Sequence, residues 1–236
     1  MKIIVLIPAA GTGRRMGAAV NKQYLLLGDR PVLAHTVALF DNAPQVDDIY
    51  IISPPDEIDY CHTAIVEQYG FTKVRAIVPG GAQRQDSVRN GLQACRAQDD
   101  DIVVIHDGAR PFFPIAQLPL LIEQARTAGA CLVGVPVQDT IKEVVAAQVV
   151  STPAREHLWQ AQTPQAFRYG LIHAAHERAL AQGFVTTDDA ALIEWSGAPV
   201  TMVTGSKCNL KITTPDDLPL ARAIWAEHEA QRGQRE

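Results

Sequence analysis

Short, continuous runs of branched apolar residues constrain the fold of this chain more than any other feature of its sequence. Six such runs recur, each bounded by turn residues: Ile3–Ile7, Ile49–Ile52, Val74–Val78, Ile102–Ile105, Ala130–Val135 and Val200–Val203. Uninterrupted apolar runs are typical of strands that are covered on both faces, because an exposed face would require alternating polar residues. The sequence therefore predicts a sheet with helices on both sides.

The segments between these runs carry helical spacing. Val32, Thr36 and Phe40 fall on one face of a helix, and Val88 and Leu92 fall on one face of another. Strand and helix thus alternate along the chain, which favours the α/β class with a mostly parallel, Rossmann-like sheet flanked by helices.

Two helix starts can be predicted from capping residues. Thr214 suits the N-cap of the last helix, with Pro215 in its first turn and Asp217 at the acidic third position. Thr187 is predicted to cap a helix that begins at the Asp188-Asp189 pair.

The alternation breaks between about residues 136 and 160. There two valine pairs, Val144-Val145 and Val149-Val150, flank a short turn. This pattern predicts a protruding β-hairpin, and apolar pairs on a projection are a solubility hazard unless a partner covers them. We therefore predict a β-arm at about 136–160 through which two copies of the chain form a homodimer. An ordinary surface hairpin is the alternative.

Composition excludes several classes of protein. Of the 236 residues, 47% are hydrophobic and 20% are charged, which is enough apolar material for a core, and the net charge of -5 gives no general attraction to nucleic acid or anionic membranes. No apolar stretch is long enough for a secretion signal or a membrane span. The four cysteines form no Cys-x-x-Cys pair, so we interpret them as buried thiols of a reduced protein. We predict a single domain over residues 1–236, located in the cytoplasm, with no nucleic-acid or membrane partner.

A glycine-rich turn follows the first apolar run, in the segment Pro8-Ala9-Ala10-Gly11-Thr12-Gly13-Arg14-Arg15-Met16-Gly17. In an open α/β sheet, ligands bind at the carboxyl ends of the strands, and small residues let backbone N–H groups approach a phosphate. A dinucleotide fingerprint would need glycine where Met16 stands, and the Gly-Lys-Ser/Thr close of a P-loop is absent. Two cations, Arg15 and Lys22, follow instead and suit the charge of a triphosphate.

Together with the Asn21-Lys22-Gln23-Tyr24 segment, this turn resembles the nucleotidyltransferases with a Rossmann-like sheet. The resemblance is greatest to the 2-C-methyl-D-erythritol 4-phosphate cytidylyltransferase family, and it extends from the first strand to the last helix. It implies transfer of CMP from CTP to the phosphate of 2-C-methyl-D-erythritol 4-phosphate. It also implies Mg²⁺, or another divalent metal, as cofactor.

Two later motifs support this resemblance. Gly80-Gly81 follows the third apolar run and precedes a helix, and in the family this turn lies against the cytosine and its ribose, with Ser87 as a polar contact. Asp107 follows the fourth run, beside the expected phosphate site, where Mg²⁺ commonly takes a carboxylate ligand. Gly108 is a departure, because the family commonly has alanine at this position.

Carried over residue by residue, the resemblance implies three catalytic cations, Arg15, Lys22 and Lys211. It implies a CTP site that consists of Pro8, Ala9, Ala10, Gly11, Gly13, Arg15, Lys22, Gly80, Gly81, Ser87, Asp107, Gly108 and Lys211. It implies an acceptor site formed by Asp107, Arg110, Thr140, Arg155 and Thr187. Of these, Thr140 and Arg155 would reach into the partner subunit's site from the arm.

The absence of a recognisable general base in the sequence agrees with this chemistry. A phosphate monoester has a second pKa of about 6, so the acceptor is already a nucleophilic dianion near neutral pH and needs no general base. The sequence has no convincing Ser-His-Asp or Cys-His set, and we predict a structural role for His106.

Four other functions compete with this interpretation. A cytidylyltransferase for ribitol 5-phosphate would share the CTP signals, whereas a sugar-1-phosphate nucleotidyltransferase fits the arm motif poorly. A non-catalytic nucleotide sensor should have lost one of the charged site residues, and none is lost. An NAD-dependent oxidoreductase is disfavoured by Met16 and by the Ser53-Pro54-Pro55 end of the second run, where a ribose-binding acid is expected.

Overall fold

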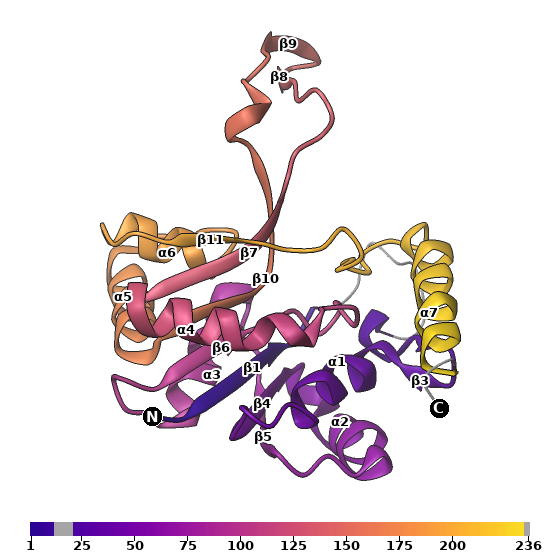
Figure 1. The fold of residues 1–236 in the computed structure, drawn as a ribbon. Helices are drawn as coiled ribbons and strands as arrows, with labels where there is room; N and C mark the ends of the chain where they lie inside the picture. The colour runs from indigo at the N-terminus through magenta and orange to yellow at the C-terminus, as the bar shows by residue number, and fades with distance from the viewer. Residues whose placement is uncertain (12–20, 234–236) are drawn as a thin grey trace.

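The computed structural model describes residues 1–11 and 21–233, and a seven-stranded sheet runs through its centre (Figure 1). The strand order is β11-β7-β10-β6-β1-β4-β5. The strands are β1 Ile3–Pro8, β4 Asp48–Ser53, β5 Val74–Pro79, β6 Ile102–Ile105, β7 Ala130–Pro136, β10 Trp159–Arg168 and β11 Thr201–Thr204. All neighbouring pairs are parallel except those that β10 makes with β6 and β7. The predicted mostly parallel α/β sheet is confirmed.

Helices cover both faces of the sheet, and the side chains of β1 alternate between them. Ile3, Val5 and Ile7 pack in a cluster with α1, α2 and α4, whereas Ile4 and Leu6 pack with α3, α5 and α6. The helices are α1 Val32–Asp41, α2 Ile58–Cys61, α3 Arg84–Cys95, α4 Leu118–Ala128, α5 Tyr169–Gln182, α6 Asp189–Trp195 and α7 Asp217–Gly233. Short helical turns occupy Lys22–Tyr24, Pro55–Glu57, His62–Glu67, Ile115–Gln117 and Arg155–His157.

The strand β10 is the element that the apolar-run criterion misses. Its central side chains, Gln162, Thr163 and Gln165, are polar yet buried. They hydrogen-bond to loops elsewhere in the chain: Gln162 Nε2 donates to Ser206 O, which follows β11, over 2.9 Å, and Gln165 Nε2 donates to Oδ2 of Asp188, the N-cap of α6, over 2.9 Å. The side chains of this strand are polar because they hold loops in place. The strand therefore contains no apolar run by which the sequence could predict it.

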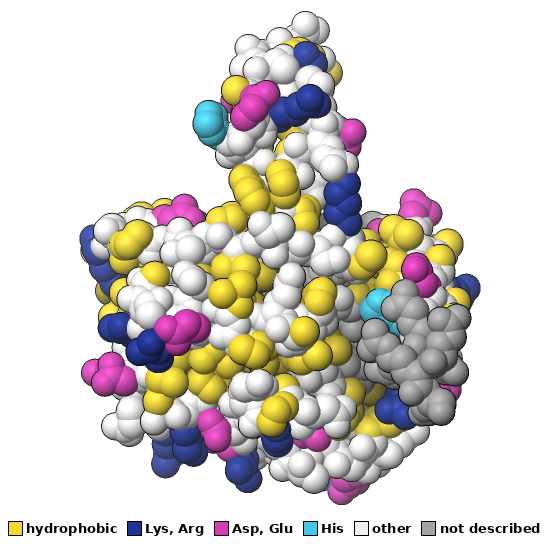
Figure 2. All heavy atoms as spheres, viewed as in Figure 1, with side chains coloured by type: hydrophobic (Ala, Val, Ile, Leu, Met, Phe, Trp, Pro, Cys, Tyr) yellow, Lys and Arg dark blue, Asp and Glu magenta, His cyan; other side chains and the backbone are white. Residues whose placement is uncertain are grey.

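The predicted hairpin projects from the body of the protein between β7 and β10 (Figures 1 and 2). It consists of β8 Glu143–Val145 and β9 Gln148–Ser151. The turn residues Ala146 and Ala147 have φ values of 47° and 64°, as in the tight turns that match the twist of a two-stranded hairpin. The four arm valines, Val144, Val145, Val149 and Val150, are 53–60% exposed.

The last helix packs away from the main sheet, against β2 Leu26–Leu27, which pairs with β3 Arg30–Pro31. It begins at Asp217, two residues later than predicted. The Asp217 carboxylate accepts the N–H groups of Thr213 and Thr214 over 2.7 and 2.8 Å and the Thr214 hydroxyl over 3.2 Å, so Asp217 ties the preceding residues to the start of the helix. A buried cluster joins this region to the body through Leu27, Val32, Phe112, Ile212 and Ala221.

The cap of α6 also differs from the prediction. Asp188, and not Thr187, is the N-cap, and its Oδ1 accepts the Ala191 N–H over 3.0 Å. Asp188 stands three residues before that N–H, which is the spacing a capping carboxylate needs.

Two smaller expectations concern membranes and thiols. Within the described ranges, no helix has the length and apolar character needed to cross a bilayer. Cys61, Cys95 and Cys131 are buried free thiols, as predicted. Cys208 is exposed, contrary to the prediction, because it lies in the loop between β11 and α7.

Candidate active site

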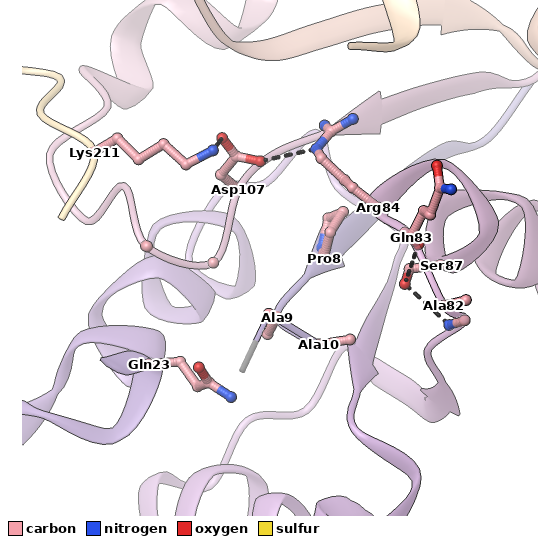
Figure 3. A pocket seen from close by; sticks show the side chains of 14 residues that line it. Pro8, Ala9, Ala10, Gln23, Ala82, Gln83, Arg84, Ser87, Asp107 and Lys211 are labelled. Carbon is pink, nitrogen blue, oxygen red and sulfur yellow. Dashed lines mark hydrogen bonds and ion pairs between the residues drawn. The ribbon is translucent and has the colours of Figure 1, made fainter. Parts of the chain in front are cut away.

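A cavity of about 520 Å³ opens at the edge of the sheet where the parallel strands β1, β5 and β6 end. Its walls come from three loops that follow these strands, from the start of α3 and from the segment that precedes α7. The lining residues are Pro8, Ala9, Ala10, Gly11, Gln23, Gly81, Ala82, Gln83, Arg84, Ser87, Asp107, Gly108, Ala109 and Lys211. Most of these side chains are labelled in Figure 3.

The cavity gathers most of the residues that the sequence assigns to a CTP site. These are Pro8, Ala9, Ala10, Gly11, Gly81, Ser87, Asp107, Gly108 and Lys211. Gly80 lies directly behind the wall, where a Cβ atom would come within 2.4 Å of the Ala10 Cβ. Gly13 and Arg15 lie outside the described residues, as does the side chain of Lys22.

The second glycine turn is tied to the helix that follows it. Ser87 Oγ accepts the Gly81 N–H and donates to Gln83 O, each over 3.0 Å. Gln83 is the N-cap of α3, and Asp86 Oδ2 accepts the Gln83 N–H over 3.1 Å, as in a capping box. A side chain at Gly81 would collide with Asp86, since a Cβ atom there would lie 2.3 Å from the Asp86 Cβ. The turn therefore requires glycine for close packing.

Asp107 is the centre of charge in the cavity, and Figure 3 shows Lys211 and Arg84 reaching it from opposite sides. Lys211 Nζ lies 2.7 Å and Arg110 Nε lies 3.6 Å from Asp107 Oδ2, and Arg84 Nε lies 3.3 Å from Oδ1. Burial would raise the pKa of Asp107, but the three cations hold this pKa well below its usual range. Asp107 is consequently a carboxylate anion throughout the physiological pH range.

The backbone of Asp107 is fixed from the central antiparallel strand. Its N–H donates to Thr163 Oγ1 of β10 over 3.0 Å. The neighbouring His106 is fully buried, with Nε2 2.9 Å from Arg110 O and Nδ1 3.1 Å from Thr163 Oγ1. Burial lowers the pKa of His106 to about 4, so the ring is neutral and is occupied by structural contacts. This arrangement agrees with the structural role predicted for it.

Two residues of this cluster, Arg84 and Asp189, are not among the site residues assigned from the sequence, although Asp189 belongs to the same Thr187-Asp188-Asp189 segment as the predicted acceptor contact Thr187. Arg84 Nη1 donates to Asp189 Oδ2 over 2.7 Å, so its guanidinium bridges Asp107 and Asp189. Burial would raise the pKa of Asp189, but the charge of Arg84 and the contact with His176 hold it below its usual value. One available signal was the position of Arg84, the first helical residue after the Gly80-Gly81 turn, where a side chain can face the same ligand.

A second cavity, of about 460 Å³, lies at the base of the arm. Lys211 lines both cavities, and Arg110 lines the second one. The other residues of the second cavity are Val135, Pro136, Gln138, Asp139, Gln160, Ala161, Gln162, Lys207, Asn209 and Leu210. Lys211 therefore stands between a cavity next to the glycine turns and a cavity next to the arm.

The predicted acceptor residues are not all assembled within one chain. Asp107 and Arg110 adjoin the two cavities, whereas Thr140, Arg155 and Thr187 are exposed and line neither of them. Arg155 lies on the arm, where its Nη1 donates to Gln138 O over 2.8 Å. Thr140 also lies on the arm, and Thr187 precedes α6.

The donor set fits a metal that arrives with a phosphate ligand. Among residues 1–11 and 21–233, no group of three or more His, Cys, Asp or Glu side chains could hold a metal ion. Asp107 contributes a single buried carboxylate, and Mg²⁺ usually takes one or two carboxylates together with substrate phosphates and waters. Asp107 thus fits one protein ligand of such an ion.

Comparison with known proteins gives a consistent result over nearly the whole chain. The family model IspD, 2-C-methyl-D-erythritol 4-phosphate cytidylyltransferase, matches residues 3–227. The chain is 60% identical to the 2-C-methyl-D-erythritol 4-phosphate cytidylyltransferase of Syntrophotalea carbinolica, a match that covers 95% of this chain and 96% of that protein. It is 56% identical to the protein of the same name from Geotalea uraniireducens, covering 98% of this chain and 100% of that one.

Solved structures agree with this result. The crystal structure of 4-diphosphocytidyl-2C-methyl-D-erythritol synthase from Anaerococcus prevotii superposes with a TM-score of 0.83 at 33% identity, over 95% of this chain and 96% of that one. The 2-C-methyl-D-erythritol 4-phosphate cytidylyltransferase of Francisella tularensis gives a TM-score of 0.82 at 33% identity, over 95% and 100% of the two chains.

Proposed function

The chain belongs to the 2-C-methyl-D-erythritol 4-phosphate cytidylyltransferase family, and on this premise we propose how its residues carry out the reaction. The enzyme transfers CMP from CTP to 2-C-methyl-D-erythritol 4-phosphate. The products are 4-diphosphocytidyl-2-C-methyl-D-erythritol and pyrophosphate, in the non-mevalonate route to isoprenoid precursors.

The observation that supports this site most strongly is the convergence of Lys211, Arg84 and Arg110 on Asp107, beside two glycine turns. Two carboxylates, Asp107 and Asp189, face these three cations, so the described side chains leave one positive charge in excess. A triphosphate would add negative charge to this cluster. Lys211, which is 36% exposed and lines both cavities, is suited to move from Asp107 to a phosphate.

The site aligns two anions and neutralises their charge, and it has no need to abstract a proton. The acceptor phosphate is dianionic near neutral pH because its second pKa is about 6. Its oxygen attacks the α-phosphorus of CTP in line with the departing pyrophosphate. Cations positioned in advance around the developing charge lower the barrier without reorganising during the reaction.

We assign the first cavity to CTP, with the triphosphate against the turn after β1 and the nucleoside against the turn after β5. Backbone N–H groups of such turns bind phosphate oxygens, and the glycines allow close approach. Lys211 would neutralise charge at the α-phosphorus from one side. Arg15 and Lys22, which complete the proposed catalytic cations, would do so from the segment that follows Gly11.

Asp107 would hold Mg²⁺ together with the triphosphate, and other divalent metals of similar ligand preference could replace it. When bound, Mg²⁺ neutralises phosphate charge and orients the triphosphate. Lys211 and Arg84, which contact the Asp107 oxygens in this structure, would be available to the substrate phosphates if Asp107 held a metal.

The acceptor would occupy the second cavity, close to Arg110 and Lys211, and Thr187 is its proposed contact from the α6 side. Thr140 and Arg155 lie on an arm that carries four exposed valines. We propose that two copies pair through their arms, so that the arm of each subunit supplies Thr140 and Arg155 to the partner's site. A reducing cytoplasm suits the four free thiols of the chain.

Subunit mixing tests the shared site. Lys211→Ala and Arg155→Ala should each be nearly inactive, since one lacks a pocket residue and the other lacks an arm residue. In a mixed dimer, the intact pocket of the Arg155→Ala subunit faces the intact arm of the Lys211→Ala subunit. After random exchange through an isologous two-fold interface, activity should return to about a quarter of the wild-type value.

The control for this experiment mixes Lys211→Ala with Asp107→Asn, which both damage the pocket and should not complement each other. Absence of recovery in the Lys211→Ala and Arg155→Ala mixture, with subunit exchange confirmed by native mass spectrometry, would contradict a site shared between subunits.

Substrate choice is tested by pyrophosphate release with Mg²⁺, each of the four NTPs and two acceptors in parallel. Release with CTP and 2-C-methyl-D-erythritol 4-phosphate is the expected result. Release only with ribitol 5-phosphate would keep the CTP chemistry but assign the protein to the alternative acceptor. Release with none of the combinations would mean that the cavity binds nucleotides without catalysis.

A further inference from the structure

On the side of the first cavity opposite Lys211, the guanidinium of Arg84 is held between two carboxylates. Its Nε lies 3.3 Å from Asp107 Oδ1, and its Nη1 donates to Asp189 Oδ2 over 2.7 Å. Arg84 is the first residue of α3 and Asp189 is the first residue of α6, so this contact spans 105 positions of sequence. The side chain of Arg84 is 27% exposed and lines the cavity, whereas that of Asp189 is 1% exposed.

Asp189 is supported from behind by a buried histidine of α5. His176 Nε2 lies 3.3 Å from Asp189 Oδ1, and both side chains are 1% exposed. Within the described part of the chain, neither ring nitrogen of His176 nor Asp189 Oδ1 has a hydrogen-bond partner of normal geometry. The contact compensates the polarity of Nε2 and Oδ1 but not that of Nδ1, although burying polar groups without partners is unfavourable. Such a residue pair requires an explanation.

The loop that leads into α6 is held by two glutamines. Gln165 of β10 accepts the Ala190 N–H over 3.0 Å and donates to Asp188 over 2.9 Å. Gln85, next to Arg84 on α3, accepts the Thr186 N–H over 3.0 Å and donates to Phe184 O over 2.9 Å. The backbone is therefore already fixed by other groups, and the Arg84–Asp189–His176 contacts are not needed to attach α6 to α3.

We propose that Asp189, supported by His176, is a positioning residue that fixes the guanidinium of Arg84 across the nucleotide cavity. A guanidinium carries five N–H donors in a planar fork, so the bonds to Asp189 and Asp107 leave donors for a phosphate. If substrate displaces Arg84 from Asp107, the bond to Asp189 keeps Arg84 directed toward the triphosphate. Without it, Arg84 is attracted only by Asp107 and loses its alignment. This inference rests on the proposed function.

The test is a double-mutant cycle between Arg84 and Asp189, because coupled residues give non-additive effects and independent residues do not. Asp189→Asn keeps the size of the side chain and removes its charge. Since small misplacements of a catalytic group can cost up to 10²-fold, kcat should fall about 10- to 100-fold, with a smaller change in KM for CTP. In an Arg84→Ala background, the same substitution should cause no further loss of kcat.

A matched control separates positioning from folding. Asp48 is also a buried carboxylate paired with a cation, Arg75. It is the first residue of β4, whereas the cavity lies at the carboxyl ends of the strands. Asp48→Asn should lower the thermal midpoint and leave kcat near the wild-type value. His176→Gln should lower kcat less than Asp189→Asn, and this loss should also vanish in the Arg84→Ala background. His176→Gln replaces Asp189→Asn in the cycle if the latter does not fold.

Two outcomes would overturn the proposal. One is wild-type kcat in Asp189→Asn with only a lower thermal midpoint, and the other is an equal fractional loss of kcat with and without Arg84. Wild-type activity is measured in the same assay with CTP and 2-C-methyl-D-erythritol 4-phosphate. An inactive wild type would mean failure of the proposed function itself, whereas an active wild type with additive losses would mean failure of this inference alone.

Discussion

Replacing Lys211 by alanine is expected to lower kcat for CMP transfer by about 10²- to 10³-fold, the cost of removing one preorganised group that stabilises transition-state charge. Lys211 Nζ lies 2.7 Å from Asp107 Oδ2, and Lys211 lines both cavities. It can therefore reach the α-phosphorus at which the bond to the acceptor phosphate forms. Its side chain is 36% exposed, and the substitution should therefore leave the fold and the thermal midpoint nearly unchanged. Steady-state pyrophosphate release, with both substrates varied, measures the effect.

Lys73 provides the matched control for this substitution. Its Nζ donates to Ala43 O over 2.6 Å. Lys73 directly precedes the amino end of β5, whereas the first cavity lies at the carboxyl end of this strand. Lys73→Ala should retain wild-type kcat. Turnover in Lys211→Ala within a few-fold of the wild type would remove Lys211 from the mechanism.

Replacing Asp107 by asparagine is also expected to lower kcat strongly. It removes the proposed metal ligand and the anion that holds Lys211, Arg84 and Arg110 in place, and kcat should fall by about 10²- to 10³-fold. Binding of CTP in the absence of metal should instead become tighter. Three cations lose their shared carboxylate and are then free to bind the triphosphate. Titration calorimetry with CTP and EDTA measures this binding directly.

These opposite changes distinguish a role in chemistry from simple damage to the site. A misfolded cavity would lower turnover and weaken metal-free CTP binding together. That result, or unchanged turnover, would contradict the role assigned to Asp107. Asp48→Asn serves again as a control for loss of a buried carboxylate away from the cavities.

The sheet could be predicted because six of its seven strands coincide with continuous apolar runs in the sequence. Runs such as Ile3–Ile7 and Ile102–Ile105 are apolar on both faces, since each side chain enters one of two helix-covered clusters. The seventh strand, β10, has buried Gln162, Thr163 and Gln165, whose partners are loops far away in sequence. No local pattern distinguishes such a strand from a polar loop, so only the tertiary structure could reveal it.

The candidate site also contains residues that a local sequence pattern predicts and residues that only the tertiary structure brings together. The turns at Gly11 and Gly80-Gly81 and the strand-end carboxylate Asp107 follow apolar runs directly, so their position on a parallel sheet brings them to one edge. Arg84 and Asp189 meet across 105 positions, and their pairing has no local signature. The predicted cap at Thr187 failed for a related reason: the next residue, Asp188, competes with it, and a carboxylate makes the stronger hydrogen bond to an N–H group.

The central claim is that the acceptor's phosphate oxygen attacks the α-phosphorus of CTP, and phosphorus NMR of the product tests it most directly. The wild-type protein is incubated with Mg²⁺, CTP and 2-C-methyl-D-erythritol 4-phosphate in which the phosphate oxygens are labelled with ¹⁸O. We predict coupled diphosphate resonances with the isotope shift of a labelled bridging oxygen, and pyrophosphate that carries no label. A bridge without label, or a product in which a hydroxyl oxygen of the acceptor carries the CMP group, would contradict this mechanism.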